Sequence, residues 1–247
     1  MNTRTIPFET DGLTGLSIEP DGGTVGELIF LLHGYGGDAA SNADFGAKLA
    51  AARADAAVVV LDGTAPVPPE NDPSRRQWWN LDETLFDGRL CSFMPYLARP
   101  EQRELIARTV PEIHETAVRL NRFVLKTVKA YGLSARDCFL AGISQGGITA
   151  FETALFCDGL ENLGGLISIG SGIVGADRLR DRPANAVPVL LARGARDEIF
   201  PKTVDYFSRA VLRESGHPVE LAEADSAHFG LEHAVCGAVC DFINRLC

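Results

Sequence analysis

Hydrophobic and polar positions alternate in blocks along most of this chain. Short apolar runs, typical of strands that are buried on both faces, are separated by longer stretches in which apolar residues recur at helical spacing. The strand candidates are Leu28–Leu32, Ala57–Leu61, Cys138–Ala141, Leu166–Ile169, Val187–Ala192 and Val219–Ala222. The helix candidates are Asp44–Arg53, Pro111–Ala130, Gly146–Phe156, Lys202–Glu214 and Leu231–Leu246. This alternation predicts an α/β fold with a mostly parallel central sheet and helices on both of its faces.

The beginning of the chain follows a different pattern. Leu13–Ile18 and Leu28–Leu32 flank the turn sequence Pro20-Asp21-Gly22-Gly23. Because aspartate, glycine and proline favour tight turns, we expect these two strands to start the sheet in an antiparallel arrangement.

A long segment interrupts the alternation between Gly63 and Pro111. It holds seven of the thirteen prolines and both tryptophans, so it is too long for an ordinary connection and too apolar for a disordered linker. Long loops on α/β scaffolds commonly frame ligand sites, and we therefore interpret residues 63–111 as an excursion over a pocket within a single domain, 1–247. The alternative is a decoration packed on the surface.

Composition narrows the partners and the compartment. The 247 residues include 33 acidic and 23 basic side chains, a net charge of −10 that disfavours nucleic acids and anionic membranes as partners. The amino terminus has no apolar signal-like segment and no stretch of about 18 apolar residues occurs, so we expect a cytoplasmic protein without a membrane span.

The six cysteines predict reduced thiols, because a chain of this size needs no disulfides for stability. Cys236 and Cys240 share a helical face, but no histidine or acid with ligand spacing accompanies them. We therefore expect no metal ion.

The strongest candidate for chemistry is the pentapeptide Gly142-Ile143-Ser144-Gln145-Gly146. It follows a strand candidate and precedes a helix candidate, the layout of a nucleophile elbow. In such a turn the serine hydroxyl projects at the carboxyl end of the sheet, and the glycines prevent collisions with neighbouring backbone. The pattern predicts Ser144 as a catalytic nucleophile.

Hydrolases with this elbow take their acid and their base from loops after later strands, in that order. Asp197 follows the strand candidate ending at Ala192, and His228 follows the one ending at Ala222. Parallel strands deliver both loops to the same edge of the sheet. Glu198 competes with Asp197 for the acid, whereas the other histidines, His33, His114, His217 and His233, lack this combination of order and loop setting.

The glycine-rich sequence His33-Gly34-Tyr35-Gly36-Gly37 follows the strand at Leu28. Such a loop can point a backbone N–H at a substrate carbonyl, and we assign the oxyanion donors to the N–H groups of Tyr35 and Gln145. The same loop also fits a dinucleotide-binding fingerprint, with Asp62 as a ribose ligand. That alternative, an oxidoreductase, leaves the order of the elbow, Asp197 and His228 unexplained.

Together these motifs resemble those of the phospholipase/carboxylesterase family of α/β hydrolases. The resemblance covers nearly the whole chain and includes Leu32–Gly36, Ala65-Pro66, Trp78-Trp79-Asn80, the elbow with Gly147, Gly194–Asp197 with Pro201, and Ala227-His228. It implies an α/β-hydrolase fold and a serine carboxylesterase that needs no cofactor and acts on small to medium esters. An acyl thioesterase or a lysophospholipase with the same triad is an alternative, as is a non-catalytic binding protein on this scaffold.

Three aromatic residues are candidates for the substrate pocket, namely Trp78, Trp79 and Phe200. The competing interpretation is that they pack in the core, since aromatic side chains readily fill protein interiors. An apolar helix face would also allow a homodimer.

Overall fold

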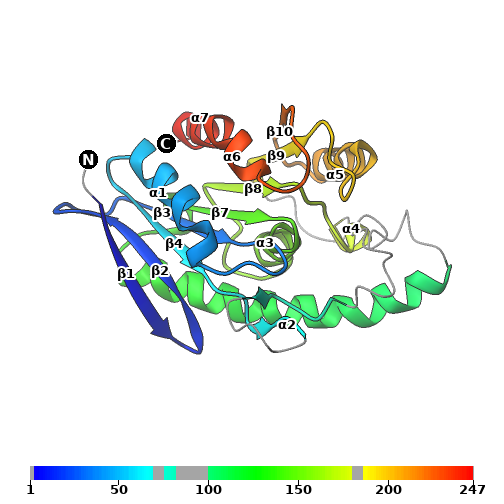
Figure 1. Cartoon of the computed structure of the whole chain (residues 1–247), viewed down its shortest axis with the longest axis horizontal. Coiled ribbons are helices and arrows are strands. Elements are labelled where there is room, and N and C mark those ends of the chain that lie inside the picture. Colours follow the sequence, from blue (N-terminus) through cyan, green and yellow to red (C-terminus); the bar gives the residue numbers. More distant parts are fainter. Residues whose placement is uncertain (1–2, 69–74, 82–99, 180–185, 247) are drawn as a thin grey trace.

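A computed structural model describes residues 3–68, 75–81, 100–179 and 186–246 (Figure 1). Its main element is an eight-stranded sheet in the order β1-β2-β4-β3-β7-β8-β9-β10. Six of these strands run parallel, namely β3 (Glu27–Leu32), β4 (Ala56–Leu61), β7 (Cys138–Ile143), β8 (Gly165–Ile169), β9 (Val189–Gly194) and β10 (Val219–Ala224). The prediction of an α/β-hydrolase fold with a mostly parallel sheet is confirmed.

The amino-terminal pairing differs from the sequence expectation. A strand that the sequence did not reveal, β1 (Thr3–Thr10), pairs antiparallel with β2 (Leu13–Pro20), and β2 pairs antiparallel with β4. The predicted partner of β2, the strand β3, lies one position further into the sheet, between β4 and β7. Most residues of β1 are exposed, so it lacks the apolar pattern by which the other strands were recognised.

Helices cover both faces of the sheet (Figure 1). One apolar cluster joins the sheet to α1 (Ala43–Ala52), α6 (Leu231–Ala234) and α7 (Cys236–Leu246). The other joins it to α2 (Pro100–Ala130), α3 (Gln145–Phe156) and α5 (Lys202–Glu214). The remaining elements are short, namely η1 (Ala40–Asn42), β5 (Ala65–Pro66), β6 (Arg76–Gln77), η3 (Ala135–Asp137) and α4 (Ala176–Leu179).

Two helix boundaries correct the sequence prediction. Helix α2 begins at Pro100 rather than at Pro111, which lies inside the helix. The carboxyl-terminal helix is divided into α6 and α7 at Val235. Of the predicted excursion 63–111, residues 69–74 and 82–99 lie outside the described residues.

The sheet has a topological switch point between β3 and β7. From β3 the chain continues to β4 on one side, whereas from β7 it continues to β8 on the other side. The connections leaving the carboxyl ends of β3 and β7 therefore diverge, which opens space for a ligand at that edge. The glycine-rich loop follows β3 and Ser144 follows β7, so both predicted motifs lie at the switch point.

Candidate active site

Ser144 occupies the sharp turn between β7 and α3. Its backbone has φ 52° and ψ −115°, a conformation that side-chain-bearing residues seldom adopt. The two glycines of the pentapeptide explain how the turn is packed. A Cβ atom on Gly142 would lie 2.3 Å from the carbonyl oxygen of Gly146, and one on Gly146 would lie 2.5 Å from that of His33. Only glycine at these positions allows β7, α3 and the end of β3 to approach so closely.

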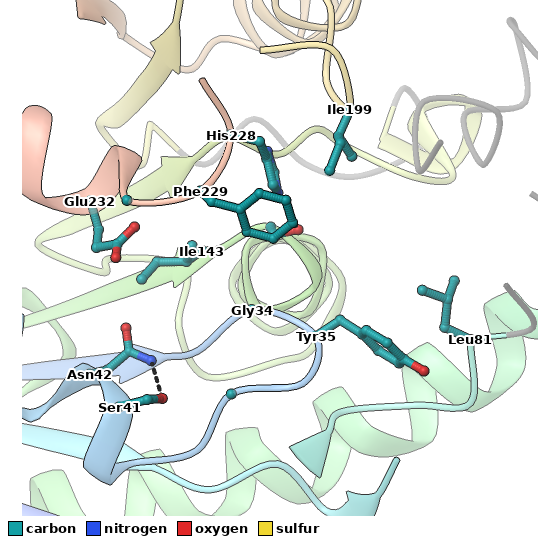
Figure 2. A pocket seen from close by; sticks show the side chains of 13 residues that line it. Gly34, Tyr35, Ser41, Asn42, Leu81, Ile143, Ile199, His228, Phe229 and Glu232 are labelled. Atoms are coloured by element: carbon teal, nitrogen blue, oxygen red, sulfur yellow. Dashed lines mark hydrogen bonds between the residues drawn. The ribbon is translucent and has the colours of Figure 1, made fainter. Parts of the chain in front are cut away.

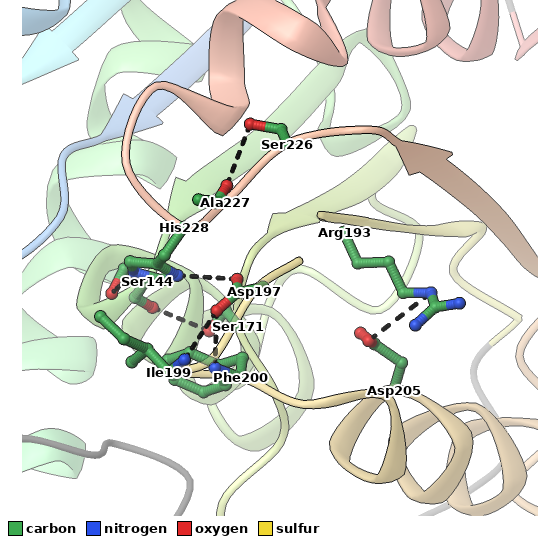
Figure 3. A network of polar contacts seen from close by, with 10 residues as sticks. All are labelled: Ser144, Ser171, Arg193, Asp197, Ile199, Phe200, Asp205, Ser226, Ala227 and His228. Carbon is green, nitrogen blue, oxygen red and sulfur yellow. Dashed lines mark hydrogen bonds and ion pairs between the residues drawn. The ribbon is translucent and has the colours of Figure 1, made fainter. Parts of the chain in front are cut away.

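Three side chains that are distant in sequence meet at this turn (Figure 3). His228 Nε2 lies 3.0 Å from Ser144 Oγ, and His228 Nδ1 lies 2.8 Å from Asp197 Oδ2. Asp197 follows β9, and His228 follows β10. The structure thus brings the predicted nucleophile, base and acid together in one hydrogen-bonded chain.

The acid and the imidazole are held in place by their surroundings. Asp197 Oδ1 accepts hydrogen bonds from the backbone N–H groups of Ile199 and Phe200, at 2.9 and 2.8 Å, which leaves Oδ2 for His228. The Phe200 ring stacks on the His228 ring with centroids 5.7 Å apart. On the sheet side, a Cβ on Gly170 would lie 3.2 Å from both His228 Nδ1 and Asp197 Oδ2. The orientation of the pair is therefore fixed by backbone donors and close packing.

The glycine-rich loop after β3 lies against Ser144. A Cβ on Gly34 would come within 3.4 Å of the Ser144 Cβ. His33 anchors this loop, because its Nε2 accepts a hydrogen bond from the N–H of Gly63 at 2.8 Å while its Nδ1 lies 2.6 Å from the carbonyl oxygen of Gly34. These partners assign the proton to Nδ1, and burial lowers the pKa of His33, which favours this neutral form.

Gln145 has a role that sequence reasoning missed. Its buried side chain accepts a hydrogen bond from the N–H of Trp78 at 3.0 Å and donates one to the carbonyl oxygen of Trp79 at 2.9 Å. Its backbone N–H belongs to the first turn of α3, where a helix offers no internal acceptor. One residue therefore fixes the segment after β6 with its side chain and begins the helix that follows Ser144 with its backbone.

A cavity of about 400 Å³ opens at Ser144 (Figure 2). Its walls come from the loop after β3, from η1, and from the loops that carry Leu81, Ile199 and His228. The lining residues are Gly34, Tyr35, Gly37, Ser41, Asn42, Leu81, Ile143, Ser144, Ile199, His228, Phe229, Gly230 and Glu232. Tyr35 of the predicted oxyanion loop is thus part of the cavity wall.

The three predicted pocket aromatics do not line this cavity. Trp78, Trp79 and Phe200 are at most 3% exposed and are not among the lining residues of this cavity. The indole N–H of Trp78 donates to the His33 carbonyl oxygen, and that of Trp79 donates to the Thr149 hydroxyl. Both tryptophans are therefore buried next to residues of the site rather than in the cavity wall, and their indole N–H groups donate to acceptors in the interior.

The remaining histidines have other partners. His114 Nδ1 lies 2.8 Å from Glu152 Oε1, and His217 Nδ1 lies 3.2 Å from the Val187 carbonyl oxygen. His233 lies on the short helix α6, 3.6 Å from Glu232. His228 is the only histidine among the residues described as lining the cavity.

Neither a metal site nor a membrane span is found in the described part of the chain. No three His, Cys, Asp or Glu side chains within the described ranges are grouped so as to hold a metal ion. None of the helices in those ranges combines the length and hydrophobicity needed to cross a bilayer. Cys236 and Cys240 are free thiols, whereas Cys91 and Cys247 lie outside the described residues.

Comparison with solved structures places the fold among known esterases. The crystal structure of esterase PE8 superposes with a TM-score of 0.77 at 24% identity, covering 95% of this chain and 99% of that one. A carboxylesterase from Mesorhizobium loti gives a TM-score of 0.67 at 16% identity, with 95% and 98% covered. SOBER1 from Arabidopsis thaliana gives 0.69 at 17% identity, with 89% and 98% covered. At these identities the likeness establishes a common fold.

Comparison by sequence establishes the family. No protein of curated function gives a significant match. The model of the phospholipase/carboxylesterase family, in contrast, matches residues 13–246, nearly the whole chain. The chain therefore belongs to the phospholipase/carboxylesterase family of α/β hydrolases and is a carboxylic ester hydrolase.

Proposed function

We propose that this protein is a serine carboxylesterase in which Ser144, His228 and Asp197 form the catalytic triad. The observation that carries the proposal is the hydrogen-bonded chain from Asp197 Oδ2 through His228 to Ser144 Oγ, at 2.8 and 3.0 Å, whose last two members line a cavity. A nucleophile, a base within reach of its proton and a group that orients the base are what acyl transfer by a serine requires.

The reaction begins with proton transfer from Ser144 to His228 Nε2 as Ser144 Oγ attacks the ester carbonyl. Asp197 keeps the Nδ1 proton of His228 in place and stabilises the imidazolium that forms. His228 then donates its proton to the departing alcohol, which leaves an acyl group on Ser144. In the second half His228 removes a proton from water, the hydroxide attacks the acyl carbonyl, and Ser144 recovers its proton as the acid departs.

The tetrahedral intermediate of each half carries a negative oxygen. We assign the N–H groups of Gln145 and Tyr35 to this oxygen, because Gln145 opens α3 directly after Ser144 and Tyr35 follows Gly34 in the loop that lies against Ser144. Donors positioned before the reaction stabilise this charge without reorganisation, and one such donor contributes about 3 kcal/mol to the transition state. The two halves therefore need neither a metal ion nor an organic cofactor.

The cavity supports small to medium esters as substrates. About 400 Å³ lies at the lower end of the range typical of small-molecule sites, and its walls include Leu81, Ile143 and Ile199. Acyl thioesters and lysophospholipids are the alternative substrates for the same triad. They are distinguished by comparing rates on a butyrate ester, a butyrate thioester of the same leaving chain length, and a lysophospholipid.

Labelling with a fluorophosphonate tests the proposal directly. We expect one adduct per chain, located at Ser144 by peptide mass, and loss of both labelling and butyrate ester hydrolysis in Ser144→Ala. His228→Ala should lower the labelling rate by a factor of at least about 10³ while the thermal unfolding midpoint stays close to that of the wild type. An adduct at another serine, or hydrolysis that survives Ser144→Ala, would refute the assignment.

A further inference from the structure

The two ends of the cavity differ in chemistry (Figure 2). At one end lie Tyr35, Leu81 and Ile199, whose side chains are mostly apolar. At the other end lie Ser41, Asn42 and Glu232, from η1 and α6. Ser144 and His228 line the same cavity, so a substrate seated on the nucleophile can reach towards the polar end.

The polar end presents hydrogen-bond acceptors without matching donors. The side chain of Asn42, which is 8% exposed, donates from Nδ2 to the Asp38 carbonyl oxygen and to Ser41 Oγ, both at 3.4 Å. Its Oδ1 points away from Ser41 in Figure 2 and accepts no hydrogen bond from a described residue. This oxygen is not one of the described buried atoms that lack a partner, so it is open to the cavity and available to accept from a ligand or from water.

Glu232 adds a negative charge to the same end. Its side chain is 19% exposed, and the ion-pair contact recorded for it is His233 Nε2 at 3.6 Å, which is longer than a hydrogen bond. The other nitrogen of His233, Nδ1, faces Asp44 at 3.9 Å, so that histidine is shared between two acids. No lysine or arginine is found among the described residues that line the cavity.

An aromatic ring also lines the cavity, beside His228. Phe229 lines the cavity next to His228 and is 84% exposed, which is unusual for a side chain of this size. Carboxylates and aromatic faces both present negative potential and both attract organic cations. Phosphate or carboxylate groups of a substrate would meet repulsion from Glu232 instead.

We propose that the end of the cavity formed by Ser41, Asn42 and Glu232 binds a positively charged group of the ester substrate, with Glu232 as the specificity-determining residue. The inference rests on the proposed function, because it concerns substrates of the Ser144 site. It favours esters that bear an ammonium group over neutral and purely anionic esters among the candidate substrates.

Matched pairs of esters that differ only in charge test the proposal on both sides of the ester bond. The alcohol pair is 2-(trimethylammonio)ethyl butyrate and its neutral isostere, 3,3-dimethylbutyl butyrate. The acyl pair is the p-nitrophenyl ester of 6-(trimethylammonio)hexanoate and that of 7,7-dimethyloctanoate. The quaternary nitrogen cannot attack its own ester, so each pair reports charge alone.

We expect kcat/KM to favour the cationic member of at least one pair, and Glu232→Gln to lower it for that member by about fivefold to tenfold. The neutral member should change by less than about twofold. The control Glu112→Gln removes the same charge from the exposed surface of α2, on the other face of the sheet, and should alter neither. Equal effects of Glu232→Gln on both members of each pair, or no effect on either, would overturn the proposal.

A binding measurement separates this inference from the proposed function. Calorimetry with 2-hydroxyethyltrimethylammonium and with 3,3-dimethylbutan-1-ol needs no turnover, so it remains informative in Ser144→Ala. Tighter binding of the cation that disappears in Glu232→Gln supports the cation site even if Ser144 proved not to be the nucleophile. Binding of the two compounds with equal affinity overturns the cation site and leaves the triad assignment intact.

Discussion

Replacing Gly146 by alanine should damage stability and activity together. An added Cβ would lie 2.5 Å from the carbonyl oxygen of His33 and 2.6 Å from that of Leu32, both of them backbone atoms at the end of β3. Contacts of a Cβ below 3.0 Å essentially never occur, so the start of α3 must move away from β3 by at least about 0.5 Å.

The loss of stability in Gly146→Ala depends on which atoms surround the added Cβ. Overpacking of a well-packed interior costs about 1 to 3 kcal/mol, and here the obstacle is the backbone of a central strand rather than a movable side chain. We therefore expect Gly146→Ala to lower the free energy of unfolding by about 3 kcal/mol. The shift also carries Ser144 and the N–H of Gln145 away from the loop after β3, and misplacement by about 1 Å can cost about a hundredfold in rate. We expect kcat/KM for a butyrate ester to fall by at least about tenfold.

Urea unfolding and steady-state hydrolysis measure the two effects on the same preparation. Gly237→Ala is the matched control, because it makes the same change in α7 at an exposed position where an added Cβ meets no atom within 4 Å. It should raise stability by about 0.5 to 1 kcal/mol and leave kcat/KM unchanged. The reasoning fails if Gly146→Ala unfolds within about 0.5 kcal/mol of the wild type, or if its activity stays normal.

Two further substitutions should change the pH dependence of stability in opposite directions. Burial raises the pKa of Asp205 to about 7 despite the nearby Arg193 guanidinium. Between about pH 4 and pH 7 the unfolded chain therefore releases this proton before the folded chain does, and the free energy of unfolding falls by about 4 kcal/mol. Asp205→Asn should flatten this decline, and an unchanged difference in unfolding free energy between pH 5 and pH 8, measured with urea, would contradict the reasoning. Gln145→Glu places an oxygen where Nε2 now donates to the Trp79 carbonyl. The variant should therefore lose about 2 kcal/mol or more of unfolding free energy at pH 8, and less at pH 5, where a protonated carboxyl can donate again. Equal losses of unfolding free energy at both pH values would argue against the contact.

The parallel strands were predictable because each is an unbroken apolar run buried on both faces. The strands β3, β4 and β7 illustrate this, since every residue in them is buried. The first strand was not predictable from periodicity, because β1 pairs through its backbone at the sheet edge and presents exposed side chains. Pairing through backbone atoms leaves little trace in the hydrophobic pattern.

Helix α2 shows the limit of reading proline as a helix start. Pro111 lies at an exposed position inside the helix. Because proline has no N–H, one helical hydrogen bond is not made, and on an exposed face water can bind the carbonyl group left without its partner. The sequence favours a start at proline because proline suits the first turn. The apolar contacts of Ile113, Ala117 and Leu120 with the core hold the helix in place regardless.

The candidate site shows the same division between local and long-range information. Spacing and order singled out Ser144, Asp197 and His228, the three residues that we propose as the triad, because the elbow and the loops after later strands are local features of the sequence. The role of the tryptophans was ambiguous in the sequence. Only the folded chain shows that the backbone N–H of Trp78 donates to the Gln145 side-chain oxygen and that its indole N–H donates to the His33 carbonyl oxygen. Glu232 was not singled out because it lies in the predicted helix 231–246, and only the fold brings it to the cavity wall.

The fastening of Trp78 has a consequence for how this protein can be altered. Its carbonyl oxygen accepts hydrogen bonds from the hydroxyls of Thr64 and Thr116, and its N–H donates to Gln145. These hydrogen bonds tie Trp78 to the segment after β4, to α2 and to the residue that follows Ser144. A substitution at Thr64 or Thr116, both distant from Ser144 in the sequence, therefore acts on the same backbone group that the Gln145 side chain holds. Changes made outside the cavity wall can thus reach the candidate site through this one tryptophan.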